Sequence, residues 1–315
     1  MLTAYAIENG RLVQLQPEAG AGWLQQSRWL DLVDPSDAER AVAASVSGLP
    51  LLDTEDVDEL EASAHHVTYP NGLQVNCLFF HQLDEEPRNT NVAFVYDGER
   101  LVSVCSREIP HARLLRMRNQ RGTYDIEDAF DLLLSLLEIK VDTLADEMEQ
   151  AYRTLEDISR LVLGRDAEEI EDAIDGLAEQ EDLVGKVRLC LMDGQRDLKF
   201  LYRQRGLTQE QQEWIAEMLG DIETLLPHNT FLSEKADFLL NTAQGFLNIE
   251  QSQIMKIFSI VALVFLPPTL IAAIYGMNFR LMPELDWPWG YPIALGLMVV
   301  AGISPYLYFK RKGWF

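Results

Sequence analysis

Two runs without a charged residue lie near the C-terminal end of the sequence, and they constrain the fold more than any other feature. Residues 257–275 form 19 such positions, and residues 290–309 form another 20. At about 1.5 Å per residue, an α-helix of either length can cross a hydrocarbon core of about 30 Å. Only 14 residues, 276–289, join the two runs. We therefore predict two antiparallel membrane-spanning helices.

Basic residues at the outer ends of this hairpin predict its orientation. Lys256 precedes the first run, and Lys310, Arg311 and Lys312 follow the second. Basic residues are retained on the cytoplasmic side of membrane spans, so we expect both termini in the cytoplasm and the loop 276–289 outside. The N-terminal residues show no basic region followed by an apolar run, which agrees with a cytoplasmic location for the large remainder.

That remainder is strongly acidic. The chain has 26 Lys and Arg against 50 Asp and Glu, a net charge of −24. Residues 250–315 hold five basic and three acidic residues, a balance of +2, so the first 249 residues have a net charge of −26. Nucleic-acid phosphates require a basic surface, and nucleic acid is therefore excluded as a partner. Cys77, Cys105 and Cys190 are widely spaced, which predicts buried, reduced thiols.

Residues 1–125 are predicted to form a cytoplasmic α/β domain. The dipeptides Asn9-Gly10, Asn71-Gly72 and Asp97-Gly98 interrupt apolar runs and are typical of β-hairpin turns. The tetrapeptide Asp34-Pro35-Ser36-Asp37 predicts a turn followed by a capped helix.

Residues 126–249 are predicted to form a long-helix region and stalk that leads into the hairpin at 250–315. A period of 3.6 residues predicts helices over 128–163 and 167–203, and a third helix begins near Gln209. The third continues without a breaker from residue 229 to 275, which is roughly 70 Å of helix. A helix of that length cannot be buried in one small subunit, so it indicates a bundle of several copies.

One face of the first apolar run is small or polar. Counting back from Ala273 in steps of four and three gives Thr269, Leu266, Ala262, Ser259, Met255, Ser252, Asn248, Gly245 and Asn241. The mean spacing of about 3.5 residues is that of a left-handed helical bundle. Two interpretations stay open: this stripe lines a pore, or its small residues let membrane helices pack closely. Two spans cannot enclose a pathway, so a pore requires a ring of copies.

The adjacent prolines raise a similar choice. Pro267 and Pro268 lack backbone donors and free the carbonyls about one turn earlier, near Leu263 and Val264. Those carbonyls face either a water-filled lumen or a neighbouring helix.

A motif follows the first run. Tyr275-Gly276-Met277-Asn278-Phe279 is followed by Met282-Pro283-Glu284-Leu285, and 185–195 (GKVRLCLMDGQ) and 265–269 (FLPPT) lie upstream. With Gly-Met-Asn between two terminal spans, the whole chain resembles the proteobacterial branch of the CorA family of magnesium channels. The resemblance implies a funnel-shaped homopentamer in a bacterial inner membrane. It also implies membrane-potential-driven influx of Mg²⁺, Co²⁺ and Ni²⁺, gated by cytoplasmic Mg²⁺.

The resemblance assigns roles to the outer end of the first span. The Asn278 side chains ring the outer mouth and hydrogen-bond to the water shell of Mg²⁺, an ion that dehydrates reluctantly. A ring of carboxylates would hold the ion too firmly for conduction. Gly276 lets the chain turn, Met277 packs behind Asn278, and Tyr275 precedes them. Thr269 is a second site for the hydrated ion.

Further down the stripe, the resemblance implies constrictions that close by dewetting at Leu266 and Met255, with Ser259, Ser252 and Asn248 on the same face. It also implies that cytoplasmic Mg²⁺ binds acidic interfaces between subunits. Glu217, Asp221 and the acidic run 53–61 are candidates, and a solvated face is the alternative for each. Mg²⁺ is thus both cargo and regulator, no organic cofactor is expected, and the partners are other copies, membrane lipid and divalent cations.

Three other classes of protein compete with a channel. An exporter of zinc or another divalent metal shares the architecture, but coupled carriers usually place a carboxylate or His within the membrane, and neither run contains Asp, Glu, His, Lys or Arg. The histidines form no ligand pattern and no nucleophile motif is visible, so we expect no enzyme. A membrane-tethered scaffold would be indifferent to Asn278.

Arg280 departs from the family pattern, because close relatives often have an acidic residue after the motif. A ring of Arg280 side chains places positive charge near an entrance for cations, opposed by Glu284 and Asp286. We expect Arg280→Glu to lower the external Mg²⁺ concentration that gives half-maximal flux. The measurement belongs at low ionic strength, where charges are least screened. An unchanged concentration there would contradict this electrostatic role.

Overall fold

The computed structural model describes residues 1–16, 21–52, 66–83, 86–122, 125–164, 167–277, 282–283 and 287–313. The chain divides into two compact units, Met1–Leu240 and Asn241–Phe315, which are described separately below. The three-part division at residues 125 and 249 stays a prediction.

The N-terminal unit contains a seven-stranded mixed sheet in the order β2-β1-β3-β7-β6-β5-β4. Strands β3 and β7 pair in parallel, and the other neighbouring pairs are antiparallel. The strands are β1 Leu2–Glu8, β2 Arg11–Gln14, β3 Trp29–Val33, β4 His66–Tyr69, β5 Gly72–Leu83, β6 Glu86–Tyr96 and β7 Leu101–Cys105.

All three hairpins form, but only Asn9-Gly10 makes the predicted two-residue turn. The prediction for Asp97-Gly98 is wrong, because Tyr96 pairs with Leu101 and leaves the four residues 97–100 as the loop. Asn9 and Gly10 join β1 to β2 with φ of 49° and 75°, as a two-residue turn of this type requires. The predicted Asn71-Gly72 turn is wrong by one residue, because Tyr69 pairs with Gly72 and leaves Pro70-Asn71 as the loop. Gly72 lies in β5, where a Cβ atom would come within 2.2 Å of the Tyr96 carbonyl oxygen.

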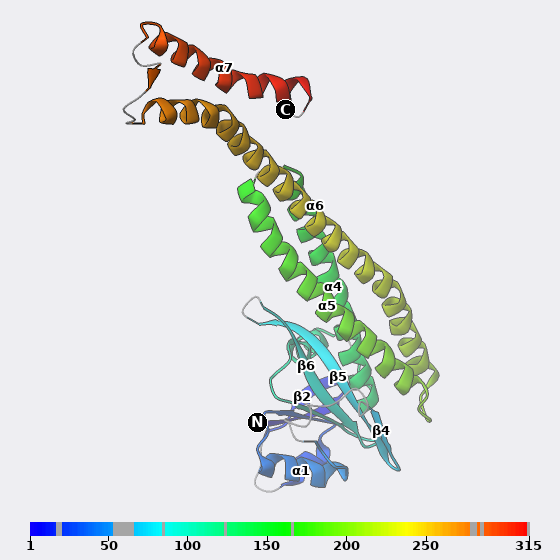
Figure 1. Cartoon of the computed structure of the whole chain (residues 1–315). Helices are drawn as coiled ribbons and strands as arrows, with labels where there is room; N and C mark the ends of the chain where they lie inside the picture. Colours follow the sequence, from blue (N-terminus) through cyan, green and yellow to red (C-terminus); the bar gives the residue numbers. More distant parts are fainter. Residues whose placement is uncertain are drawn as a thin grey trace. The chain divides into compact units, whose positions relative to one another are not determined.

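Helices cover both faces of the sheet (Figure 1). Helix α1, Asp37–Ser47, packs its Ala43 against a core that includes Leu30 and Val102. Ser36 caps α1 in a reciprocal pair with Glu39, which confirms the predicted cap. The short helix η1, Ala21–Gln26, precedes β3, and α3, Pro110–Gln120, packs with the long helices on the other face.

The long helices match the sequence prediction closely. Helix α4 is Ala129–Gly164 and α5 is Ala167–Tyr202, each within one residue of the predicted bounds. Helix α6 is Gln209–Tyr275, 67 residues, and its three internal prolines do not end it. In the N-terminal unit α6 packs against both partners: Asn229 Nδ2 donates to the Val184 carbonyl of α5 at 2.9 Å, and Lys235 Nζ lies 4.4 Å from the Tyr152 ring centroid of α4.

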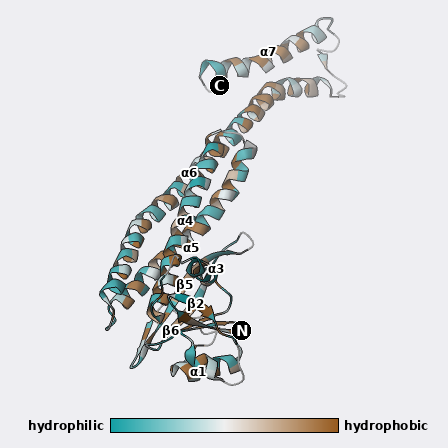
Figure 2. Ribbon diagram, turned by 180° about the vertical axis from the view of Figure 1, so that it is seen from behind, coloured by the Kyte–Doolittle hydropathy of each residue, from teal (hydrophilic) through white to brown (hydrophobic). Residues whose placement is uncertain are grey.

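The C-terminal unit contains the end of α6 and α7, Gly290–Arg311, and both helices are long and apolar enough to cross a membrane. Hydrophobic residues predominate along these segments (Figure 2). A Cβ atom on Gly302 of α7 would lie 3.2 Å from Val264 O and 3.2 Å from Pro268 Cγ. Val264 O is the carbonyl that Pro268 deprives of its helical donor. The open question is thus answered for this carbonyl, which packs against the neighbouring helix.

A buried ionic network holds the sheet to the long helices in the N-terminal unit. Lys140 Nζ on α4 lies 3.1 Å from Asp193 Oδ2 and 3.9 Å from Asp197 Oδ2, both on α5. Asp193 also accepts from the Leu78 N–H of β5 at 2.6 Å. His66 Nε2 at the start of β4 lies 2.8 Å from Asp197 Oδ1. Four elements therefore meet at one set of charges.

The charges in this network stabilise one another. Burial alone lowers the pKa of Lys140, but the two carboxylates more than offset it and the pKa is raised. Burial acts to raise the pKa of Asp193, yet Lys140 and the Leu78 N–H bring it below its usual value. Asp197 lies deeper, and burial raises its pKa. A raised lysine pKa stabilises the fold below the lysine's unfolded pKa, and a lowered aspartate pKa stabilises it above the aspartate's unfolded pKa. This Lys140–Asp193 contribution is therefore present at neutral pH.

We expect Lys140→Met to destabilise the protein by about 3–5 kcal/mol, because it removes the buried cation that lies between the carboxylates of Asp193 and Asp197. The readout is the thermal unfolding midpoint of the full chain in detergent. Lys140→Met with Asp193→Asn is the matched control, since it removes the charge from both partners and keeps an acceptor for Leu78 N–H. A double variant no more stable than Lys140→Met would contradict charge imbalance as the cause.

Candidate ion pathway

The predicted stripe lies on an exposed face of the C-terminal part of α6. Leu266 and Met255 are 68% and 61% exposed, and Thr269 is exposed as well. Val264, which contacts α7, lies two residues from Leu266 and hence about 160° around the helix. The remaining predicted lining residues, Ser259, Ser252 and Asn248, are also exposed. The contact with α7 therefore covers one face of α6 and leaves the stripe on the other.

Two of the three hydroxyls on this face, those of Thr269 and Ser259, satisfy their donors locally. Thr269 Oγ1 donates to the Phe265 carbonyl at 2.7 Å, and Ser259 Oγ donates to the Met255 carbonyl at 2.8 Å. Such bonds to the preceding turn let a hydroxyl lie in an apolar helix. The lone pairs of each oxygen stay available, and an acceptor is what the water shell of a cation can use. The stripe therefore presents acceptors without fixed charge.

Helix α6 ends at the outer motif. Tyr275 is its last residue, the Gly276 N–H donates to the Ala272 carbonyl at 2.9 Å, and the Met277 N–H donates to the Ile274 carbonyl at 3.3 Å. Met277 is 48% exposed. An apolar cavity of about 420 Å³ lies beside Tyr275 and Gly276, and Trp287 and Tyr291 line its other side.

Several predicted site residues lie outside the described residues. These are Asn278, Arg280 and Glu284 in the outer loop, and the acidic run 53–61. Their roles stay predictions from the sequence.

Basic residues lie at the ends of the two apolar segments that are far from the outer motif. Lys256 lies on α6 before the apolar run, and Lys310 and Arg311 form the last turn of α7, with Lys312 next. Cations at a helix C-terminus complement its dipole. Lys310 Nζ lies 5.8 Å from the Tyr306 ring centroid, and Lys312 Nζ lies 5.3 Å from that of Tyr308. Such aromatic contacts are favourable for a cation at a membrane interface.

The candidate regulatory carboxylates, Glu217 and Asp221, are exposed and lie one turn apart on α6. Among the described residues of the single chain, no group of three or more His, Cys, Asp or Glu side chains is arranged to hold a metal ion.

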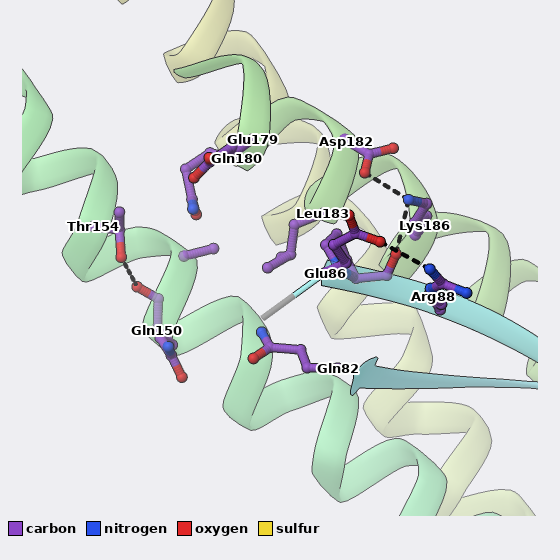
Figure 3. Close-up of a pocket in the computed structure, with 12 residues that line it drawn as sticks. Gln82, Glu86, Arg88, Gln150, Thr154, Glu179, Gln180, Asp182, Leu183 and Lys186 are labelled. Carbon is purple, nitrogen blue, oxygen red and sulfur yellow. Dashed lines mark hydrogen bonds and ion pairs between the residues drawn. The ribbon is translucent and has the colours of Figure 1, made fainter. Parts of the chain in front are cut away.

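A polar groove of about 710 Å³ elsewhere in the N-terminal unit offers no better alternative (Figure 3). Its basic residues already have partners: Lys186 Nζ lies 2.6 Å from Asp182 Oδ2, and Arg88 Nη2 lies 2.9 Å from Glu86 Oε2. We assign no ligand to this groove.

The sequence analysis missed two parts of this arrangement. Gly302 gave no signal beyond its small size in an apolar run, although its close approach to α6 fixes which face stays open. Lys140 was also missed, and here a signal existed, because a lysine stands among the apolar positions of an amphipathic helix. Of the aspartates that pair with it, Asp193 lies within the 185–195 stretch and Asp197 lies two residues after it.

Solved structures share this fold over nearly the whole chain. The CorA magnesium transporter from Methanocaldococcus jannaschii gives a TM-score of 0.73 at 21% identity, covering 100% of this chain and 99% of that chain. The full-length CmaX protein gives 0.72 at 15% identity, covering 98% and 96%. At these identities the likeness shows the fold alone.

Sequence relatives are much closer. A protein of Pectobacterium atrosepticum named "Magnesium transport protein CorA" is 48% identical over 316 aligned positions, covering 100% of both chains. The protein of the same name from Escherichia coli strain K12 is 46% identical, again over 100% of both. The family model described as "CorA-like Mg2+ transporter protein" matches residues 25–311. The chain, with its two C-terminal membrane spans, therefore belongs to the CorA-like Mg²⁺ transporter family.

Proposed function

We propose that the chain forms a channel through which Mg²⁺, and also Co²⁺ and Ni²⁺, enters a bacterial cell down the membrane potential. The observation that supports this most directly is the exposed face of α6 opposite α7, which presents hydroxyls and small residues with no ionisable group in the membrane. The relatives' name, magnesium transport protein, supports the choice of ion. In this proposal the whole N-terminal unit and both termini lie in the cytoplasm, because basic residues at the ends of the apolar helices are retained on that side of the membrane.

The pathway requires several copies. Two apolar helices cannot surround a water-filled lumen, and the stripe faces away from the α7 contact within its own chain. A cyclic ring places the α6 stripes around one axis, with α7 outside. The homopentamer implied by the resemblance is the ring we propose, in contact with membrane lipid.

Selection takes place at the outer mouth. The amide oxygens of Asn278 accept hydrogen bonds from the water shell of Mg²⁺, so the ion passes without the full cost of dehydration. Tyr275, Gly276 and Met277 support that ring, and Thr269, six residues before the end of α6, supplies the next acceptors. Selection by hydration shell and ring diameter does not depend on soft or hard ligands, which is why Co²⁺ and Ni²⁺ also pass.

The membrane potential supplies the driving force. Two charges that move through 100 mV, inside negative, gain about 4.6 kcal/mol. That free energy corresponds to roughly three decades of accumulation. No coupling reaction is needed.

Cytoplasmic Mg²⁺ closes the pathway in this proposal. Binding near Glu217 and Asp221 joins neighbouring copies and offsets repulsion between their carboxylates. The pore then narrows at Leu266 and Met255, where apolar side chains expel water. Loss of the ion loosens the ring and lets the pore wet.

Asn278→Ala is expected to abolish potential-driven Mg²⁺ influx, because it removes the acceptors at the outer mouth. The measurement is uptake into proteoliposomes under an imposed inside-negative potential. Asn71→Ala, in the exposed β4–β5 turn, is the matched control and should transport like the wild type. Wild-type protein that carries Mg²⁺ only with a proton or metal counter-gradient would overturn the channel and favour a coupled exporter.

Leu266→Ser is expected to allow influx at internal Mg²⁺ concentrations that close the wild type, because a ring of hydroxyls stays wet where a ring of leucines does not. The measurement is uptake into proteoliposomes preloaded with Mg²⁺. Phe265→Ser introduces the same side chain one residue off the stripe, on a residue that is 64% exposed. Equal leaks from both variants would contradict a lining role for Leu266.

A further inference from the structure

Helix α5 presents an exposed stripe that the proposed function does not use. Four residues of α5 recur at steps of three and four: Leu189, Met192, Arg196 and Lys199. Arg203 follows directly after the last residue of the helix, Tyr202. We call these five residues the basic stripe. Leu189 and Met192 are 57% and 54% exposed. Arg196 lies 3.3 Å from Asp193, whereas Lys199 and Arg203 form no ion pair with any described residue. Unpaired cations beside exposed apolar side chains are unusual in a chain with a net charge of −24.

Helix α6 presents a complementary stripe. Glu210, Glu213, Glu217 and Asp221 are exposed at steps of three and four, and Phe231, 49% exposed, lies further along the same face. We call these five residues the acidic stripe. Within the described part of the chain, none of its carboxylates is in an ion pair. Each stripe is charged near the α5–α6 connection and apolar further from it.

The two stripes lie at the same height along their helices. A Cβ atom on Gly194 of α5 would lie 3.6 Å from Ile222 Cδ1 of α6, and Arg188 Nη1 donates to Thr230 Oγ1 at 3.2 Å. Counting along both helices from these contacts places Lys199 level with Glu217, and Leu189 within about a turn of Phe231.

The stripes nevertheless face away from each other within one chain. Lys199 lies five residues from Gly194, and Glu217 five residues from Ile222, so each is about 140° around its helix from a residue of the α5–α6 contact. No ion pair joins the stripes among the described residues, although their heights match. The basic and acidic stripes therefore lie at one height but point in different directions. Each stripe can contact the opposite stripe of another copy that lies at the same height.

We propose that the basic stripe of one copy binds the acidic stripe of the next, and so forms a ring contact in the N-terminal unit. This inference rests on the proposed ring. The contact is heterologous, and such contacts close into rings under cyclic symmetry. Cyclic symmetry keeps all copies at one height, so Lys199 meets Glu217, and Leu189 and Met192 meet the end of the stripe that contains Phe231. Arg196 already lies 3.3 Å from Asp193, so Lys199 and Arg203 are the cations that face the four carboxylates.

Disulfide cross-linking of the full chain in membranes tests the contact. Lys199→Cys with Glu217→Cys should give, on mild oxidation, a ladder of covalent oligomers that ends at the complete ring. The native Cys77, Cys105 and Cys190 are buried and do not interfere. Lys199→Cys with Glu223→Cys is the matched control, because Glu223 is exposed but lies about 9 Å further along α6 on another face. It should stay monomeric in the gel. Monomeric product from the test pair, or an equal ladder from the control, would overturn the contact.

Charge reversal provides an independent measurement. Lys199→Glu should lower the fraction of assembled ring that survives dilution in detergent, and adding Glu217→Lys should restore it, as a coupled pair requires. A double variant no more assembled than the worse single variant would overturn the pairing. Mg²⁺ influx by the wild type distinguishes the two proposals: influx without cross-linking overturns only this contact, and cross-linking without influx overturns only the channel.

Discussion

The hydrocarbon core of a membrane offers the backbone no hydrogen-bond partner, and the design of the C-terminal unit depends on that constraint. Pro268 removes the N–H that would bond the Val264 carbonyl, so this carbonyl has to lie against protein. Gly302 of α7 meets it, because a missing side chain lets the helices approach. That contact commits α7 to one face of α6. The opposite face, with its hydroxyls and Leu266, stays exposed, and this is the face that lines the pathway in the proposed ring.

Charge is handled in opposite ways in the two units. The N-terminal unit buries Lys140. Its charge is compensated by Asp193 and Asp197, and the Leu78 N–H donates a further hydrogen bond to Asp193. The membrane part of α6 excludes ionisable groups and presents only neutral acceptors. A structural ion pair has to hold its partner, whereas the conducting site that we propose has to release its ion. The contrast follows from the same electrostatics.

The sequence predicted elements where one residue type dictates a local conformation, and it failed where a distant segment decides. Asn9-Gly10 forms the predicted turn because this turn requires positive φ at both positions, and Asn and Gly adopt it readily. The same dipeptide at Asn71-Gly72 gave a wrong prediction, because Gly72 lies in β5, where the lack of a side chain lets the backbone come close to the Tyr96 carbonyl on another strand. Whether the Val264 carbonyl faces a lumen or a neighbouring helix could not be predicted without knowing where Gly302 lies. The polarity of the stripe was predictable from spacing, but its exposure opposite α7 required the packing.

Helix α6 joins both units, and this makes the proposed ring contact relevant to gating. Glu217 and Leu266 lie on one helix that Pro227 does not end. In the proposed ring, each α6 is held to the basic stripe of a neighbour at one end and lines the pore at the other. Coupling between distant sites needs an element with two arrangements that both sites bias. In the proposed ring, a contact between copies that is made or broken at Glu217 as cations bind and leave is such an element, and it lies on the helix that also contains Leu266.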